Sequence, residues 1–341
     1  MAVAHIALLL GCAVVIYLAC EWFVNAVEWL GVRLKMGTLA IGTVLAAIGT
    51  ALPESVVTLV AVTLGNGTTS KDIGVGAAMG GPLALATIAY GVTGWMLVRL
   101  NRKRAKAATG SAESTDPLAE VSLSSLARDQ RWFMAIFVVK VALGLVAFAI
   151  KPWLGLVFFA AYGVYFVREM TSDDAAHSSA DLEPLKLQPG RATPSGWAVA
   201  VQTVATLALI FVASQVFVGQ LEWAGPAMGL PAAVTALLLS PIATELPEVM
   251  NAVIWVRQGK VQLALANISG AMMIQATIPS GLGLLFTTWK FDHALLSSGI
   301  VTMLAITYLL ILMRKGQFTA AKLCGAAGFY VVFAASLPFL I

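Results

Sequence analysis

The chain has 341 residues, of which 59% are hydrophobic and only 11% are charged. Because a soluble domain carries about 25% charged residues, this composition excludes an ordinary water-soluble protein, a disordered chain and a disulfide scaffold. The formal net charge of +4 reflects membrane topology, because the basic residues lie in loops between apolar segments. It therefore predicts no nucleic-acid partner.

Ten apolar segments of spanning length follow one another along the chain, each near the roughly 20 residues that a membrane helix needs. The sequence therefore predicts an all-α polytopic membrane protein with ten transmembrane helices in the lipid bilayer. The fourth and fifth segments are short and are separated only by Lys151 and Pro152, so nine spans are the alternative. The predicted segments are 3–30, 38–64, 72–98, 132–150, 152–167, 197–221, 231–256, 261–289, 293–313 and 320–340.

The distribution of lysine and arginine favours ten spans. With ten spans, 17 of the 21 basic residues fall in loops on one side, three fall on the other side, and Lys140 lies inside the fourth span. Positively charged loops stay in the cytoplasm, which predicts a cell-membrane protein with both termini outside. A nine-span arrangement would break this segregation after the fourth span.

Lys140 is a basic residue at membrane depth. It could pair with a carboxylate such as Glu21, gate a pathway, face the bundle interior for structural reasons, or snorkel to the interface if the span is shifted. The sequence leaves these interpretations open.

Two segments of the chain match each other without gaps at an offset of 194 residues. Residues 28–54 and 222–248 are identical at nine of 27 positions, which include an E-W-x-G motif and a T-x-L-P-E motif. Because the first copy begins in an odd-numbered span and the second in an even-numbered one, the copies cross the membrane in opposite directions. Such an inverted-topology repeat is the architecture of many secondary transporters.

The repeat divides the chain into two five-helix halves, 1–168 and 197–341, joined by a cytoplasmic linker loop over 169–196. The loop carries several acidic residues. A solvated connector explains them more simply than a metal sensor does.

The two copies end in Glu54 and Glu248, each well inside its predicted span. A carboxylate near the bilayer centre costs about 2.5–3.5 kcal/mol, so two of them at matching positions predict a bound cation. Glu28 and Glu222, at the start of the copies, are placed near opposite interfaces, where each can be solvated.

A proline precedes both of the mid-membrane glutamates. Proline removes a backbone donor and frees a carbonyl oxygen in the preceding turn, so Thr50 and Thr244 are expected to offer carbonyl and hydroxyl oxygens. Carboxylates with several carbonyls form a hard oxygen cage, which suits Ca²⁺ with its roughly six to eight oxygen ligands. On the helix after the second glutamate, Asn267 and Gln275 are expected to turn a polar face toward this cavity.

These motifs resemble the two alpha-repeats of the cation/Ca²⁺ exchanger superfamily, expected here over about 38–98 and 231–289. The resemblance implies a prokaryotic sodium/calcium exchanger-like protein with no tightly bound cofactor. It also implies that Glu54 and Glu248 are the central Ca²⁺ ligands and that Thr50 and Thr244 supply backbone carbonyls. The residues that carry it are Gly49-Thr50-Ala51-Leu52-Pro53-Glu54 with Asp72-Ile73-Gly74-Val75-Gly76, and 240–248 with 263–275.

Departures from the family pattern bear on the counter-ion. The usual serine of G-T-S-L-P-E is Ala51 in the first repeat and Glu245 in the second. The polar side chains of the family's two G-S-N-x-x-N stretches are lost here, except for one amide, which is Gln275. These losses weaken Na⁺ coupling, and Glu245 adds a third carboxylate that can carry a proton instead. The predicted metal ligands are Glu54, Glu248, Thr50, Thr244, Glu245, Asn267 and Gln275.

The predicted function is a secondary antiporter that exchanges Ca²⁺ for Na⁺ or H⁺ by alternating access, and not an enzyme. Antiport of another divalent such as Mn²⁺ is the alternative, because oxygen cages for these ions overlap. A passive cation channel also stays open. An intramembrane enzyme needs a nucleophile with a base, or a ligated metal, and the sequence has no H-E-x-x-H motif, no G-x-S-x-G motif and no His at membrane depth.

Overall fold

The computed structural model describes residues 2–63, 68–107, 117–119, 121–171, 182–227, 238, 241 and 244–340. Some side chains within these ranges also lie outside the described part, among them those of Glu54 and Glu222. All regular structure in the described ranges is helical, so the predicted all-α class is confirmed.

Two predicted segments in the first half form composite helices. The second segment passes from α2 through the π-helix η1 into α3, and the third passes from α4 through the π-helix η2 into α5. Such π turns are rare and are frequently found at functional sites, and both lie in the predicted alpha-1 repeat. The bounds are α1 Ala2–Arg33, α2 Thr38–Ala40, η1 Ile41–Ala46, α3 Ala47–Thr63, α4 Thr68–Ala84, η2 Leu85–Ala89 and α5 Tyr90–Ala107.

The fourth and fifth predicted segments are separate helices, because α6 ends at Leu145 and the 3-10 helix η3 begins at Lys151. This break agrees with the ten-span interpretation of that region. The remaining bounds are α6 Leu123–Leu145, η3 Lys151–Leu154, α7 Gly155–Met170, α8 Gly196–Ala227, α11 Leu246–Arg257, α12 Val261–Phe286, α13 His293–Arg314, α14 Ala320–Cys324, α15 Ala326–Ser336 and η6 Leu337–Phe339.

Seven helices in the described part of the chain are long and apolar enough to cross a membrane. This number does not confirm the predicted ten. Of the other segments, α6 carries four charged residues in 23, 38–51 is a short apolar helix, and only 12 residues of α11 are described. The seven are Ala4–Arg33, Gly74–Arg104, Lys151–Met170, Gly196–Phe217, Val261–Phe286, His293–Arg314 and Ala320–Phe339.

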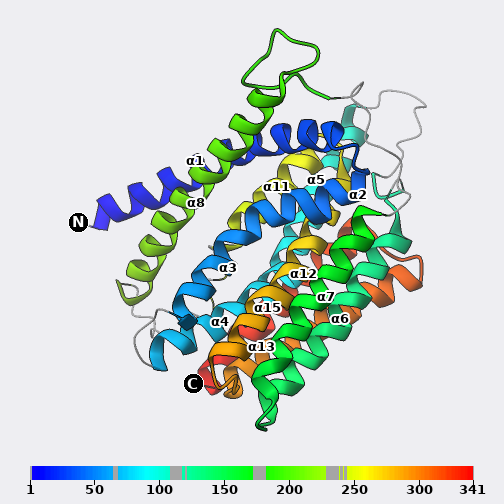
Figure 1. Ribbon diagram of the computed structural model, residues 1–341. Coiled ribbons are helices and arrows are strands. Elements are labelled where there is room, and N and C mark those ends of the chain that lie inside the picture. Colours follow the sequence, from blue (N-terminus) through cyan, green and yellow to red (C-terminus); the bar gives the residue numbers. More distant parts are fainter. Residues whose placement is uncertain are drawn as a thin grey trace.

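Helix α12 is the central rod of the bundle and packs against α3, α4, α6, α7, α11 and η1. Small residues allow the closest approach: a Cβ on Gly270 would lie 2.2 Å from the carbonyl oxygen of Thr43 in η1. Gly42 faces α12 in the same way, because a Cβ on Gly42 would lie 2.6 Å from the Cβ of Ala266. Helices α1 and α8 pack together at one side of the molecule (Figure 1). Glycines at the crossing thus bring a first-repeat helix onto a second-repeat helix.

The carboxylate of Glu28, expected to be solvated at an interface, is instead buried and paired. Its side chain is 3% exposed. One oxygen accepts a hydrogen bond of 2.8 Å from the Trp255 indole, and the other forms an ion pair with Lys260. The expectation failed because the α11–α12 turn, 232 residues away in sequence, brings a cation to this end of α1.

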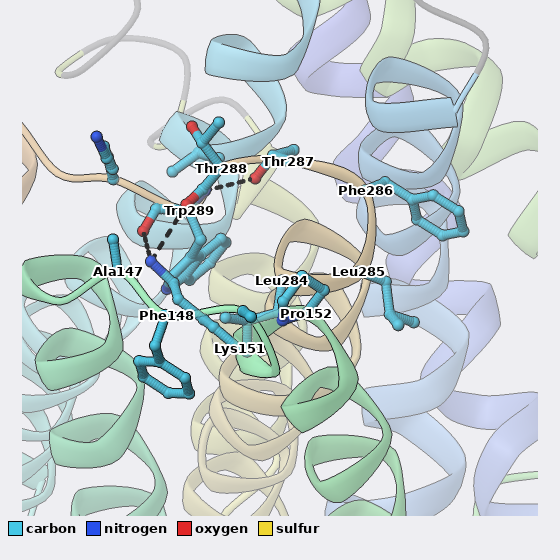
Figure 2. Close-up of a pocket in the computed structure, with 13 residues that line it drawn as sticks. Ala147, Phe148, Lys151, Pro152, Leu284, Leu285, Phe286, Thr287, Thr288 and Trp289 are labelled. Carbon is cyan, nitrogen blue, oxygen red and sulfur yellow. Dashed lines mark hydrogen bonds between the residues drawn. The ribbon is translucent and has the colours of Figure 1, made fainter.

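A lysine holds the turn between α6 and η3. The Lys151 ammonium donates to the carbonyls of Thr288 (3.2 Å) and Trp289 (2.8 Å) (Figure 2). It also donates to the carbonyl of Val146 at 2.7 Å, so these hydrogen bonds join two turns at the same end of the bundle. A cavity of about 580 Å³ opens beside this lysine. Its lining residues include no carboxylate, so the predicted cation site lies elsewhere.

Candidate cation-binding site

The second-repeat motif forms a helix break. Helix α11 begins at Leu246 with Pro247 in its first turn, and Glu245 is the residue immediately before the helix. Proline is tolerated at this position because the first amides of a helix have no intrahelical acceptor. The break therefore places Glu245 and Glu248 about one turn apart at the start of α11.

Both of these carboxylates are buried. Glu248 is 0% exposed and Glu245 is 1% exposed. The side-chain amide of Gln275 on α12 donates to both oxygens of Glu245, at 2.8 Å each. The structure thus brings together two residues that the sequence singled out 30 positions apart. Buried negative charge of this kind is retained where cations or hydrogen bonds compensate it.

Asn267 also faces the start of α11. Its side-chain amide donates to the backbone carbonyl of Glu248 at 3.4 Å, and the side chain is fully buried. Its Oδ1 has no hydrogen-bond partner among the described residues. An amide oxygen is a hard ligand suited to Ca²⁺, so the predicted polar face of α12 is present and turned toward α11.

The two threonines bond within their own chain segments. Thr50 is 2% exposed, and its hydroxyl donates to the backbone carbonyl of Ala46 at 3.1 Å. The Thr244 hydroxyl donates to the backbone carbonyl of Pro241 at 3.3 Å. The carbonyl that Pro53 deprives of its helical donor belongs to Gly49, four residues earlier. Thr50 thus lies beside the freed carbonyl and does not carry it.

Glu54 is the one predicted ligand whose side chain lies outside the described part of the chain, although its backbone lies in α3. Among the described residues, no group of three or more His, Cys, Asp or Glu side chains is arranged to hold a metal ion. The second repeat contributes two carboxylates, and the acidic contribution of the first repeat stays a prediction.

A glycine on α4 makes room for the side chains of Glu245 and Gln275. A Cβ on Gly81 would lie 2.5 Å from Oε1 of Gln275 and 2.7 Å from Oε1 of Glu245. A side chain at this position would displace the ends of these two side chains, so the glycine permits their present close approach to α4. The polar side chains that the family has around Gly81 are absent here. Polar groups at this place come instead from Gln275 and Glu245 of the second repeat.

Asn251 is a candidate ligand that sequence reasoning missed. It lies on α11 three residues after Glu248, is 0% exposed, and neither polar atom of its amide has a hydrogen-bond partner among the described residues. Buried polar groups without partners are rare in proteins. The E-x-x-N spacing on one helix was the available signal, but position 57, its repeat counterpart, is a valine.

Broken helices that bring buried carboxylates and amides together inside a multi-pass bundle define a membrane transport protein for small cations. The family model for the sodium/calcium exchanger protein matches residues 4–170 and 198–337. The chain belongs to this family, whose members are exchangers and not enzymes.

Individual relatives agree with this assignment. A protein of Alkalimonas amylolytica assigned as the antiporter CaxA is 26% identical over 324 residues, covering 92% of this chain and 90% of the relative. The sodium-calcium exchanger NCX_Mj soaked with 10 mM Na⁺ and zero Ca²⁺ has a TM-score of 0.75 at 17% identity, covering 99% of this chain and 100% of the other. The same exchanger soaked with 2.5 mM Na⁺ and 10 mM Sr²⁺ has a TM-score of 0.73 at 16% identity, with 98% and 99% coverage. At these identities NCX_Mj shows the shared fold.

Proposed function

We propose that the protein is a secondary antiporter that moves Ca²⁺ across the cell membrane in exchange for Na⁺ or H⁺. Glu54 and Glu248 form its mid-membrane site, with Glu245, Asn267 and Gln275 beside them and backbone carbonyls near Thr50 and Thr244. Ca²⁺ and the counter-ion occupy this site in turn, and the two halves alternate its access between the two sides.

The observation that carries the proposal is the pair of buried glutamates at the start of α11, where Gln275 donates to the Glu245 carboxylate and Asn267 donates to the backbone carbonyl of Glu248. A carboxylate shielded from water binds a cation more strongly than an exposed one, because charge interactions strengthen as the dielectric constant falls. Oxygen ligands without Cys or His favour hard divalents over soft transition metals.

The proposal includes ten spans, both termini outside, and two inverted halves, 1–168 and 197–341, joined by 169–196. The two matched segments of the family model, 4–170 and 198–337, support this division. The basic loops support the orientation.

The presence of Glu245 supports H⁺ as the counter-ion at least as strongly as it supports Na⁺. Two carboxylates one turn apart in a buried setting repel each other, and a proton on one of them relieves that repulsion. Gln275 donates its amide to both Glu245 oxygens, which holds this carboxylate beside the site.

The test is ⁴⁵Ca²⁺ transport by the purified protein in proteoliposomes, with a Na⁺ gradient alone and then with a pH gradient alone. Counter-ion-dependent Ca²⁺ uptake is expected, and the gradient that drives it identifies the counter-ion. Glu248→Gln should lower uptake by roughly 100-fold or more, because removing a buried charged partner costs about 3 kcal/mol.

Glu21→Gln is the matched control, because Glu21 is 36% exposed and pairs with Lys186 at 3.7 Å, away from the site. It should transport as the wild type does. Exchange that survives Glu248→Gln would remove this residue from the site. Ca²⁺ flux that needs no counter-ion would replace the antiporter with a channel, and Mn²⁺ transport in preference to Ca²⁺ would change the cargo.

A further inference from the structure

A groove between α5 and α11 opens at the basic side of the bundle. It has a volume of about 380 Å³, and one wall comes from each half of the chain. The lining consists of three cations and four apolar side chains, with no carboxylate. These residues are Met96, Arg99, Leu100 and Lys103 of α5 and Val253, Val256 and Arg257 of α11. This α5–α11 groove is separate from the acidic site, which lies at the other end of α11.

The α5–α11 groove lies at the level of the membrane surface. The predicted third and seventh spans end directly before Arg99 and Arg257, on two helices that pack against each other. Met96 and Val253, about one turn earlier on each helix, are apolar. Trp95 beside them is 54% exposed, as is typical of an aromatic residue at a bilayer interface. The groove is therefore apolar on the membrane side and cationic at the surface.

No described carboxylate neutralises the cations of the groove. All four ion pairs in the described part of the chain involve other basic residues, and Arg99, Lys103 and Arg257 are exposed. Aromatic rings hold both guanidinium groups in place. That of Arg99 lies 5.6 Å from the centre of the Trp95 ring. That of Arg257 lies 6.0 Å from the centre of the Tyr17 ring and donates to the Tyr17 hydroxyl. A guanidinium has five N–H donors, so donors remain for a ligand.

Membrane topology alone does not explain this arrangement. Topology requires only that basic residues lie in the loops on one side. Arg102 of α5 meets that requirement and does not line the groove. Arg99 and Lys103 are four residues apart, so they share one face of α5, and Arg257 joins them from a second helix. Basic pockets between membrane helices are typical binding sites for the headgroups of anionic lipids.

We propose that the α5–α11 groove binds one anionic phospholipid from the leaflet on the basic side of the membrane. The lipid phosphate contacts Arg99, Lys103 and Arg257, and an acyl chain lies along Met96 and Val253. A soluble anion would match the cations only, whereas a phospholipid also covers the apolar walls. The bound lipid joins the end of a first-half helix to the end of a second-half helix, so it should stabilise their contact.

The experiment is native mass spectrometry of the full-length protein in detergent, titrated with dioleoyl-phosphatidylglycerol and separately with dioleoyl-phosphatidylcholine. The wild type should bind one phosphatidylglycerol in preference to phosphatidylcholine. Its midpoint of thermal unfolding should rise with phosphatidylglycerol, because a ligand of the native state stabilises that state. In Arg99→Gln/Arg257→Gln the affinity for phosphatidylglycerol should fall by roughly 30-fold, about fivefold for each cation removed.

Arg102→Gln/Lys315→Gln is the charge-matched control. It removes two exposed cations from the same side of the protein, neither of which lines the groove, and should bind phosphatidylglycerol as the wild type does. If the Arg257 substitution prevents folding, Lys103→Gln serves instead, because its side chain makes no ion pair in the described part of the chain. Lys103→Gln should lower the affinity by about fivefold.

Equal binding of the two lipids by the wild type overturns the proposal. Undiminished phosphatidylglycerol binding by the groove variants, or an equal loss in the control, also overturns it. An equal rise in the unfolding midpoint with inorganic phosphate would replace the lipid with a soluble anion.

The chain's own acidic segment after α5, which contains Glu113, Asp116 and Glu120, is the rival occupant. In that case the wild type binds no phosphatidylglycerol, and neutralising these three residues creates binding, which overturns the proposal. None of these measurements involves ion transport, so a negative result leaves the proposed function intact.

Discussion

At the scale of single residues, buried amides mark this site more specifically than its carboxylates do. Asn267 and Asn251 are both fully buried, and each has at least one polar atom without a hydrogen-bond partner among the described residues. By contrast, the buried Asn25 contacts the carbonyls of Glu183 and Pro184 and accepts from the amide of Lys186. A buried polar atom without a hydrogen-bond partner costs about 1–3 kcal/mol of folding free energy, and a bound cation can offset this cost.

Asn251→Leu tests whether this amide is a ligand. Leucine keeps the branched shape and the number of side-chain heavy atoms and removes both desolvated polar atoms, so the thermal stability of the ion-free protein in detergent should stay unchanged or rise. If the amide oxygen binds Ca²⁺, affinity should fall by roughly tenfold, which corresponds to about 1.4 kcal/mol. Ca²⁺ binding and thermal unfolding, with and without Ca²⁺, measure both effects.

Asn25→Leu is the matched control, because Asn25 is also buried but makes hydrogen bonds at a distance from the site. It should lower thermal stability, because its partners lose their hydrogen bonds, and should leave Ca²⁺ affinity unchanged. A stable Asn251→Leu with wild-type Ca²⁺ affinity would show that Asn251 has no part in binding.

At the scale of helices, interruptions and close crossings create the site. Pro247 in the first turn of α11 and Pro82 inside α4 each remove a backbone donor, and the π-helices η1 and η2 lie in segments of the first repeat. Helix α12 then crosses η1 through glycines, which lets the two repeats meet without side chains between them. The ion pair of Glu28 with Lys260 fixes one end of α1 to the turn before α12.

Gly270→Ala tests the crossing of α12 and η1. The added methyl group would meet backbone atoms of Thr43, the carbonyl oxygen at 2.2 Å and Cα at 2.5 Å, and backbone atoms cannot rotate away. Overpacking of this kind costs about 1–3 kcal/mol, so the midpoint of thermal unfolding should fall and exchange should slow.

Gly328→Ala is the control for that substitution. Gly328 lies in α15, and a Cβ there would meet nothing within 4 Å, so the gain in helix propensity, up to about 1 kcal/mol, should leave stability equal or slightly higher. If both alanine variants unfold at the wild-type temperature, the tight crossing does not constrain the bundle.

At the scale of the whole molecule, the sequence predicted the class of fold and part of the site. Hydropathy predicted helices, and the motifs predicted the family, because both signals are local in sequence. The sequence placed Glu245 and Gln275 in one candidate site, and the hydrogen bonds between them are a finding of the structure. The partners of Glu28 and of the buried Lys140 ammonium, which donates to the Ala78 carbonyl, depend on which helices pack together and at what height, and neither hydropathy nor repeat matching contains that information.

The orientation of the chain is the whole-molecule prediction that follows from its charge distribution. Single cysteines at Ala149 and Gly190, both exposed, are introduced separately after Cys12, Cys20 and Cys324 are replaced. A membrane-impermeant maleimide should label Ala149→Cys in intact cells and Gly190→Cys only after the membrane is opened, because basic loops stay in the cytoplasm.

Ala149 precedes helix α7, and Gly190 lies in the segment between α7 and α8. Their labelling must therefore differ if α7 crosses the membrane. Equal labelling from outside would contradict the crossing itself. The reverse pattern would keep the crossing and invert the protein, and Glu28, with its partners Trp255 and Lys260, would then face the outside. The side of the membrane on which the Glu28–Lys260 pair lies therefore depends on this measurement.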